Sequence, residues 1–249
     1  MRLRNVFSLL YYKQIFDPYN RVMCGRFTLT KNSLDVMTFL DAHFQLTHNA
    51  FLNDYEPSYN VAPSQRVLTV LNDGTTNRAG FLPWGFPVAG SSLKKTMLAN
   101  ARSETIMDKV TFRSSYRHKR CLIIADGFYE WDRASKPSIP HYFRIPDHAI
   151  FAFAGLWTSY VDEHNQKHFG VTLLTTPSTR TSMEPIHDRL PVVLSSDQYA
   201  FWLNPKSSID EFNFLFQSYN APDWHHYEIS PRVNRVLNND ITCIDPLKK

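Results

Sequence analysis

The chain has 249 residues, 43% of them hydrophobic, and a formal net charge of +4, a composition typical of a soluble protein with one sizeable core. The small net charge excludes a basic field over the whole surface, so any nucleic-acid site must be a local groove. Three widely spaced cysteines (Cys24, Cys121 and Cys243) exclude a disulfide framework or a zinc knuckle and favour a reducing compartment. No apolar run has the length of a membrane span.

The first 22 residues differ from the rest of the chain. Arg2, Arg4 and Lys13 flank a short apolar run, VFSLLYY. The run is too short for a secretory signal and no small-residue cleavage site follows it, while serine is scarce for a transit peptide. We therefore expect residues 1–22 to be a dispensable extension, or the product of a wrongly chosen start codon, and residues 23–249 to form one domain.

The body of the chain begins with a predicted strand and a predicted helix. Residues 26–29 alternate between polar and apolar side chains, as a half-buried strand does. Residues 32–46 follow a helical period, with Asn32 or Ser33 as the N-cap. The apolar face of this helix is predicted to consist of Leu34, Met37, Leu40 and Phe44.

Loops, a hairpin and a second helix follow. Residues 56–65 read as a proline-punctuated loop, and residues 66–82 as a hairpin that turns at Asn72-Asp73-Gly74. Residues 103–118 predict a helix or helical turn. Residues 121–125 predict a short buried strand that leads into the sequence DGFYEW.

The remaining elements are mostly strands. Further strands are predicted at 141–145, 149–160, 168–175, 190–194 and 224–229, and helices at 197–203 and 208–219. Strands outnumber helices, short connections join neighbouring strands, and neither a repeat nor a change of composition follows residue 24. The sequence therefore predicts a single α+β domain with mainly antiparallel pairing.

Five short stretches are unusually specific when they are taken together. They are MCGRF (23–27), PSYNVAPSQ (57–65), NARSET (100–105), GFYEW (127–131) and IHDRLPVVL (186–194). With the intervening Trp84-Gly85-Phe86, they resemble in order the SRAP family, the SOS-response-associated peptidases or abasic-site processing proteins. The resemblance runs from Met23 to about residue 240, which is nearly the whole chain.

The resemblance implies a fold, a partner and a reaction. The family fold is a compact α+β domain around a curved, mainly antiparallel sheet with flanking helices. Members bind single-stranded DNA in the DNA damage response and link covalently to abasic sites through an N-terminal cysteine. The resemblance implies no cofactor and no metal, a monomer, and a cytoplasmic protein that joins the nucleoid when bound to DNA.

The family's functional residues carry over to matching positions here. The resemblance implies catalytic roles for Cys24, Asn100, Glu130 and His187, and a DNA-binding groove containing Arg26, Arg102 and Arg189. Independently of the resemblance, the basic run 112–120 offers Arg113 as a phosphate contact, although such a run is also typical of a solvated face. Trp84 and Phe86 could stack on unpaired bases or belong to the core.

The proposed chemistry explains why these residue types are needed. An α-amine, with a pKa near 8, forms an imine with the abasic aldehyde more readily at neutral pH than lysine, with a pKa of about 10.4. The thiol of the same residue then closes a thiazolidine ring in an intramolecular step. Glu130 and His187 suit the proton transfers, and an apolar setting would raise the pKa of Glu130. Asn100 can hold the amine or a sugar oxygen without titrating.

Two features depart from the family pattern. Residues precede Met23, and an internal Cys24 has no free amine. Family members more often carry a proline before the glycine of the GFYEW motif, where this chain has Ile124-Ala125-Asp126. The difference could shift the loop that carries Glu130.

Two other functions fit the same residues. A Cys24–His187 pair with Asn100 has the residue types of a cysteine peptidase, and hydrolase or lyase chemistry follows from self-processing before Cys24 or from adduct formation. If residues 1–22 remain attached, a non-covalent single-stranded DNA-binding protein is the alternative.

Overall fold

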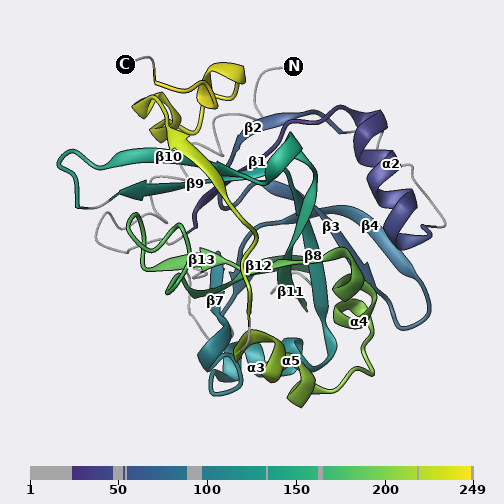
Figure 1. Cartoon of the computed structure of the whole chain (residues 1–249). Helices are drawn as coiled ribbons and strands as arrows, with labels where there is room; N and C mark the ends of the chain where they lie inside the picture. Colours follow the sequence, from purple (N-terminus) through teal and green to yellow (C-terminus); the bar gives the residue numbers. More distant parts are fainter. Residues whose placement is uncertain are drawn as a thin grey trace.

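The computed structural model describes residues 24–46, 53, 55–88, 97–132, 134–161, 165–217 and 219–247. The prediction that residues 1–22 are an extension falls outside these residues. Within them, two large sheets and a set of helices lie in three layers (Figure 1). Among the residues described, no helix is both long and apolar enough to cross a membrane.

The first sheet has five strands, all paired antiparallel. Their order across the sheet is β15-β10-β9-β1-β2. The strands are β1 (Arg26–Leu29), β2 (Ser58–Val61), β9 (Gly127–Asp132), β10 (Ile139–Arg144) and β15 (His225–Glu228).

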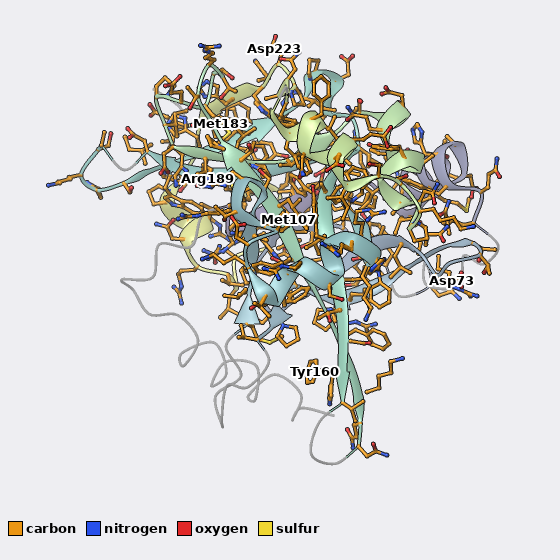
Figure 2. All side chains as sticks on the ribbon, turned by 90° about the horizontal axis from the view of Figure 1, so that it is seen from below. Asp73, Met107, Tyr160, Met183, Arg189 and Asp223 are labelled. Atoms are coloured by element: carbon orange, nitrogen blue, oxygen red, sulfur yellow. The ribbon has the colours of Figure 1, made fainter. Side chains whose placement is uncertain are left out.

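The second sheet follows the order β13-β12-β11-β8-β3-β4. Its members are β3 (Arg66–Asn72), β4 (Asn77–Pro83), β8 (Arg120–Ala125), β11 (Phe151–Val161), β12 (Lys167–Pro177) and β13 (Arg189–Pro191). Two shorter strands join this path: β14 (Val193–Leu194) pairs with β11, and β7 (Asn100–Arg102) pairs with β12 in parallel. A separate ribbon joins β5 (Phe86–Pro87) to β6 (Met97–Leu98). The hairpin of β11 and β12 projects from the body, with Tyr160 near its end (Figure 2).

Two apolar clusters separate the layers. One lies between the sheets, where Phe27 and Phe128 of the first sheet meet Ile123, Phe153 and Val171 of the second. The other lies under the helices, which cover the opposite face of the second sheet. These helices are α2 (Ser33–Phe44), α3 (Val110–His118), α4 (Tyr199–Leu203) and α5 (Ile209–Gln217).

A third, smaller cluster lies on the outer side of the first sheet. It joins Tyr129 and Tyr142 to Val233 and Cys243 of the C-terminal segment. This segment lies beside β10 (Figure 1). The C-terminal segment therefore shields the five-stranded sheet from solvent on the side away from the main core.

The predicted α+β class with mainly antiparallel strands is confirmed, and one of the two predicted N-caps is found. Asn32 caps α2 by accepting a hydrogen bond from the Asp35 N–H. The buried face of α2 includes Val36 instead of Leu34, which is 63% exposed. Part of the predicted loop 56–65 forms β2. GFYEW lies in strand β9, which belongs to the five-stranded sheet, whereas the preceding strand β8 belongs to the second sheet.

Candidate active site

Cys24 lies immediately before β1 and is buried, with 3% of its surface exposed. β1 and β9 run antiparallel, with Arg26 opposite Tyr129, so the chain before Arg26 passes alongside Glu130. The Cys24 N–H donates a hydrogen bond to Glu130 Oε1 at 2.6 Å. The φ of Cys24 is 44°, a left-handed conformation that non-glycine residues seldom adopt. The register of two strands thus places a carboxylate on the backbone nitrogen of Cys24.

Asp126 directs the chain from β8 into β9. Its fully buried carboxylate accepts hydrogen bonds from the hydroxyls of Thr28 and Thr30 and from the N–H of Lys31. Its own N–H donates to the Thr28 carbonyl at 2.9 Å. These bonds tie the point where the chain leaves one sheet to the end of β1 in the other. Glu130 lies four residues later in β9 and is 1% exposed.

Gly127 is required at this crossing by the approach of another side chain. A Cβ at position 127 would lie 2.1 Å from the Tyr142 hydroxyl. That hydroxyl is within hydrogen-bonding distance of Thr28 Oγ1, at 3.0 Å, and of His148 Nε2, at 2.9 Å. Burial and the nearby Asp126 charge raise the pKa of Tyr142 well above its usual range, so the hydroxyl stays protonated.

His187 faces Glu130 from the loop before β13. Its Nε2 lies 3.8 Å from Glu130 Oε2, a separation too long for a direct hydrogen bond. The imidazole is 1% exposed and the carboxylate 2% exposed, so both groups are inside the protein. The Arg189 N–H donates to His187 Nδ1 at 3.1 Å. The Arg189 carbonyl oxygen lies 3.2 Å from the same nitrogen, so Nδ1 can accept from the Arg189 N–H or, when protonated, donate to that oxygen.

The backbone around His187 is fixed by two buried residues. The His187 N–H donates to the Met183 carbonyl at 2.9 Å, and Ser178 Oγ donates to the His187 carbonyl. The Ser178 N–H donates to the Asp188 carbonyl at 3.0 Å. Met183 and Arg189 appear on the same side of the molecule (Figure 2). The ring orientation is therefore set by packing and hydrogen bonds before any substrate arrives.

Arg189 forms an ion pair beside this group. Its guanidinium binds Glu104 through two nitrogens, with Nη2 to Oε2 at 2.9 Å, and donates to the Thr175 carbonyl at 2.8 Å. Burial alone would raise the pKa of Glu104, but the hydrogen bonds and charge of Arg189 outweigh it and leave that pKa below its usual range. Arg102 lies opposite Thr175 in the parallel register of β7 and β12, and its side chain is exposed. The structure therefore brings Arg102, Glu104 and Arg189 together around one residue of β12.

Asn100 begins β7, and Trp84 holds the chain just before it. The Trp84 Nε1–H donates to the Ala99 carbonyl at 2.8 Å, and the Trp84 ring lies 5.1 Å from that of Phe27 in β1. Trp84 thus connects the strand after Cys24 to the strand that carries Asn100. Trp84 is 1% exposed and Phe86 is 2% exposed. Neither ring has a face open for base stacking in this structure, so the core alternative fits both.

Two other basic residues of the expected DNA site have local partners. Arg26 donates to Asn60 Oδ1 at 2.8 Å and to the Val233 carbonyl at 2.7 Å, which ties β1 to the C-terminal segment. Arg113 is exposed on α3, and its Nε donates to the Met107 carbonyl at 2.7 Å. The described contacts do not connect Arg113 to Cys24, Glu130 or His187.

Sequence reasoning assigned no role to Asp188 or Glu104, although both lie inside the quoted motifs. Asp188 Oδ1 is 3.2 Å from His187 Nδ1. Its position next to a candidate catalytic histidine was visible in the sequence, but its contact with Nδ1 depends on the loop conformation. Within the described ranges, no group of three or more histidine, cysteine or acidic side chains is arranged to hold a metal ion.

Comparison with known proteins places the chain among relatives of similar length. The family model described as SOS response associated peptidase (SRAP) matches residues 23–236. The abasic site processing protein YoaM of Bacillus subtilis is 40% identical over 227 residues, covering 90% of this chain and 98% of the relative. The abasic site processing protein YedK of Escherichia coli is 28% identical over 232 residues, covering 90% of this chain and all of the relative.

A solved structure shares the fold. The crystal structure of a Bacteroides thetaiotaomicron protein superposes with a TM-score of 0.76 at 22% identity, covering 90% of this chain and all of that one. At this identity the likeness concerns the arrangement of the strands and helices alone.

Proposed function

The chain belongs to the SOS response associated peptidase (SRAP) family, and from this membership we propose that it processes abasic sites in DNA. In the proposed reaction it binds single-stranded DNA and forms a covalent thiazolidine crosslink through Cys24, which shields the lesion from strand breakage. The proposed setting is the cytoplasm, on the nucleoid, as part of the DNA damage response.

The observation that carries this proposal is the contact between Glu130 and the nitrogen of Cys24. In the intact chain this nitrogen is an amide, but in a chain that begins at Cys24 it is an α-amine. A carboxylate 2.6 Å away can take the proton of the ammonium and leave the amine free to attack. His187, 3.8 Å from the other carboxylate oxygen, completes a buried acid–base pair. Neither group is needed for a merely structural cysteine.

The proposed reaction has three steps, of which the first forms the C–N bond, the second breaks the C–O bond and the third forms the C–S bond. The neutral amine attacks the aldehyde carbon of the ring-opened abasic sugar to give a carbinolamine. The carbinolamine loses its hydroxyl as water and becomes an iminium ion. The Cys24 thiol gives up its proton and attacks the same carbon, which closes the five-membered ring. Starting from an ammonium and a thiol, the products are the neutral ring, one water and one proton released to solvent.

This reaction needs Cys24 at the N-terminus, so residues 1–22 would not be part of the working protein. Translation that starts at Met23, followed by removal of that methionine, gives this terminus with no further chemistry. Self-cleavage is the second route: the Cys24 thiol attacks the carbonyl of residue 23, the Cys24 nitrogen leaves as an amine, and water then hydrolyses the resulting thioester, which releases residues 1–23 and frees the thiol. The contact between Glu130 and this nitrogen supports a role in protonating it as it leaves, so the same carboxyl would serve both self-cleavage and the later crosslinking.

The proposed DNA contacts divide by exposure. Arg102 is exposed beside the Glu104–Arg189 pair and Arg113 is exposed on α3, so both can approach phosphates. Arg189 is 6% exposed and forms an ion pair with Glu104. We therefore assign its guanidinium to the wall of the DNA groove, while its backbone N–H orients His187. Arg26 has hydrogen-bond partners within the protein, which supports a mainly structural contribution.

Replacing Cys24 tests the covalent step. We expect Cys24→Ala and Cys24→Ser to abolish a heat-stable adduct with an abasic oligonucleotide, because neither retains an amine and a thiol on one residue. Binding to intact single strands should remain salt-sensitive and nearly unchanged, since phosphate contacts dominate affinity. Gel assays on the two substrates measure both quantities. A serine variant that keeps the heat-stable adduct would show that the thiazolidine is dispensable. If the wild-type protein forms no adduct, the alternative of a non-covalent single-stranded DNA-binding protein is favoured.

Replacing Arg102 tests the DNA path. For Arg102→Ala we expect weaker binding to intact single strands and a smaller slope of log affinity against log salt, by roughly 0.7 for one phosphate contact. Arg78→Ala is the matched control, because Arg78 pairs with Asp73, which lies across the molecule from Arg189 (Figure 2). Equal slopes for the two variants would remove Arg102 from the DNA path.

A further inference from the structure

The proposed crosslinking reaction releases a proton inside a buried site. In the full chain Cys24, Glu130 and His187 are 3%, 1% and 4% exposed, so the proton acceptor next to the Cys24 nitrogen is the Glu130 carboxylate. Glu130 Oε1 is placed to accept that proton, and Oε2 faces His187 Nε2 across 3.8 Å. One water or a small side-chain shift closes this gap. The proton then needs a way out on the far side of His187.

His187 Nδ1 has partners for both of its protonation states. When it carries a proton, Asp188 Oδ1 and the Arg189 carbonyl can accept it, each at 3.2 Å. When it carries none, the Arg189 N–H donates to it at 3.1 Å. Nδ1 therefore keeps a hydrogen-bond partner after it has released its proton.

Asp188 connects this nitrogen to solvent. Its side chain is 81% exposed, whereas that of His187 is 1% exposed. Both residues line a cavity of about 350 Å³ between the segments 132–134 and 178–188. Asp132 and Glu184 line the same cavity, and hydrogen bonds from Ser135 and Ala134 hold the pKa of Asp132 below its usual range. Three carboxylates repel a phosphate and attract a proton, so this cavity is unsuited to the DNA backbone.

We propose that Asp188 is the outlet of a proton relay in which Cys24 nitrogen, Glu130, His187 and Asp188 act in sequence. This assignment rests on the proposed crosslinking function. The relay starts from the neutral ring with its proton on Nδ1, next to Asp188 Oδ1 and the Arg189 carbonyl, so that Nε2 is free to accept. The proton leaves the Cys24 ammonium for Glu130 Oε1, the Glu130 carboxyl protonates His187 on Nε2, and His187 releases its Nδ1 proton to Asp188 Oδ1, which passes it to water in the cavity. His187 ends in its other tautomer. A protein that reacts once with one lesion needs only one such passage.

Single-turnover crosslinking rates of the protein expressed from the full chain test the relay. Intact-mass measurement of each variant ensures that the compared molecules begin at the same residue. Asp188→Asn keeps the shape but cannot accept the proton, and we expect its rate to fall roughly tenfold, less than for a group that touches the substrate. Asp188→Glu should recover most of the rate. Glu184→Gln is the matched control, since it removes the same charge from the same cavity while Glu184 contacts the Arg180 N–H instead of His187.

Chemical rescue separates proton transfer from structure. For Asp188→Ala we expect the rate to rise with added formate, which can enter the cavity and accept the proton, while the rate of wild type stays constant. Affinity for intact strands should be the same in Asp188→Asn and Glu184→Gln. A wild-type rate in Asp188→Asn, equal slowing in Glu184→Gln, or no response to formate overturns the relay alone. No adduct in wild type overturns the proposed function as well.

Discussion

Glu130 has a different partner at each of its two carboxylate oxygens. Oε1 accepts from the Cys24 nitrogen at 2.6 Å, and Oε2 faces His187 Nε2 at 3.8 Å. The short contact orients the carboxylate in the resting protein, while the longer one leaves room for a proton donor or a substrate oxygen. A residue with these two contacts suits proton exchange at the Cys24 nitrogen better than DNA binding.

Removing the charge of Glu130 should therefore change rates and leave the fold intact. Glu130→Gln keeps a hydrogen-bonding head of the same size but cannot take up a proton. We expect crosslink formation to slow by about 10²–10⁴-fold, the range for loss of a general acid–base group. A time course of quenched reactions with an abasic oligonucleotide measures this rate, and thermal unfolding checks that the variant is folded. A wild-type rate for both formation and reversal would exclude Glu130 from the mechanism.

At the residue scale, the sequence predicted which side chains form the site but not how they are arranged. The motifs named Cys24, Glu130 and His187, and the structure brings these three together. The roles of Trp84 and Phe86 could not be settled from the sequence, because an aromatic residue in a motif is equally suited to stacking and to packing. Their burial follows from contacts with distant partners such as Phe27 and Phe112.

At the scale of the elements, β12 links several parts of the site. It pairs with β7, which carries Asn100 and Arg102, and with β13, which begins at Arg189. Towards its other end, the Gly85 N–H donates to the Val171 carbonyl at 2.8 Å. The segment that contains Trp84 thus packs on the same strand that pairs with the two strands carrying Arg102 and Arg189.

Gly170 permits this close contact. A Cβ at position 170 would lie 2.2 Å from the Gly85 carbonyl oxygen, whereas one at Gly80 would meet nothing within 4 Å. We expect Gly170→Ala to lower the free energy of unfolding by about 1–3 kcal/mol, as overpacking typically does. Gly80→Ala should stay within about 0.5 kcal/mol of wild type. Urea unfolding compares the two, and equal stabilities would show that the contact is not tight.

The pairing of β10 with β15 should be sensitive to acid. Burial lowers the pKa of His141, partly offset by Glu228 and Asp132, and burial together with the charges of His141 and His225 lowers the pKa of His226. The two rings are 5.7 Å apart. Because the unfolded chain binds protons near pH 6.5 and the folded chain binds them only at lower pH, this stabilisation is complete above about pH 6.5 and is lost as the pH falls.

We therefore expect the free energy of unfolding to decrease between about pH 7 and pH 5, and His226→Gln to make that decrease shallower. His118→Gln, which changes an exposed residue of α3, serves as the control. Urea midpoints at the two pH values measure the difference. A decrease of the same size in His226→Gln and wild type would show that the β10–β15 histidines do not contribute.

Element prediction succeeded where local periodicity decides the structure and failed where distant contacts do. Alternation and turn residues located β1, the β3–β4 hairpin and the long strands β11 and β12. The same signals could not show that β9 belongs to the other sheet. That crossing depends on Asp126 binding Thr28, Thr30 and Lys31, nearly a hundred residues earlier in the chain.

At the scale of the whole molecule, the site lies where the two sheets come together. Cys24 and Glu130 come from the five-stranded sheet, whereas Asn100 and Arg189 come from strands of the eight-stranded sheet. The cluster between the sheets, which contains Phe27, Trp84 and Leu190, fixes their relative position. Reactive groups on two rigid sheets are held in place before substrate binds, which is the preorganisation that an oriented multistep reaction requires.

The central claim is that Cys24 reacts as an N-terminal residue, with both its nitrogen and its sulfur. The most direct test is to express the full coding sequence, react the protein with a single-stranded oligonucleotide that contains one abasic site, digest both components and locate the adduct by mass spectrometry. The account predicts a modified peptide that begins at Cys24 and carries the sugar remnant with the loss of one water, its nitrogen and sulfur both blocked. An adduct on a lysine, or on Cys24 with residue 23 still attached, would contradict it.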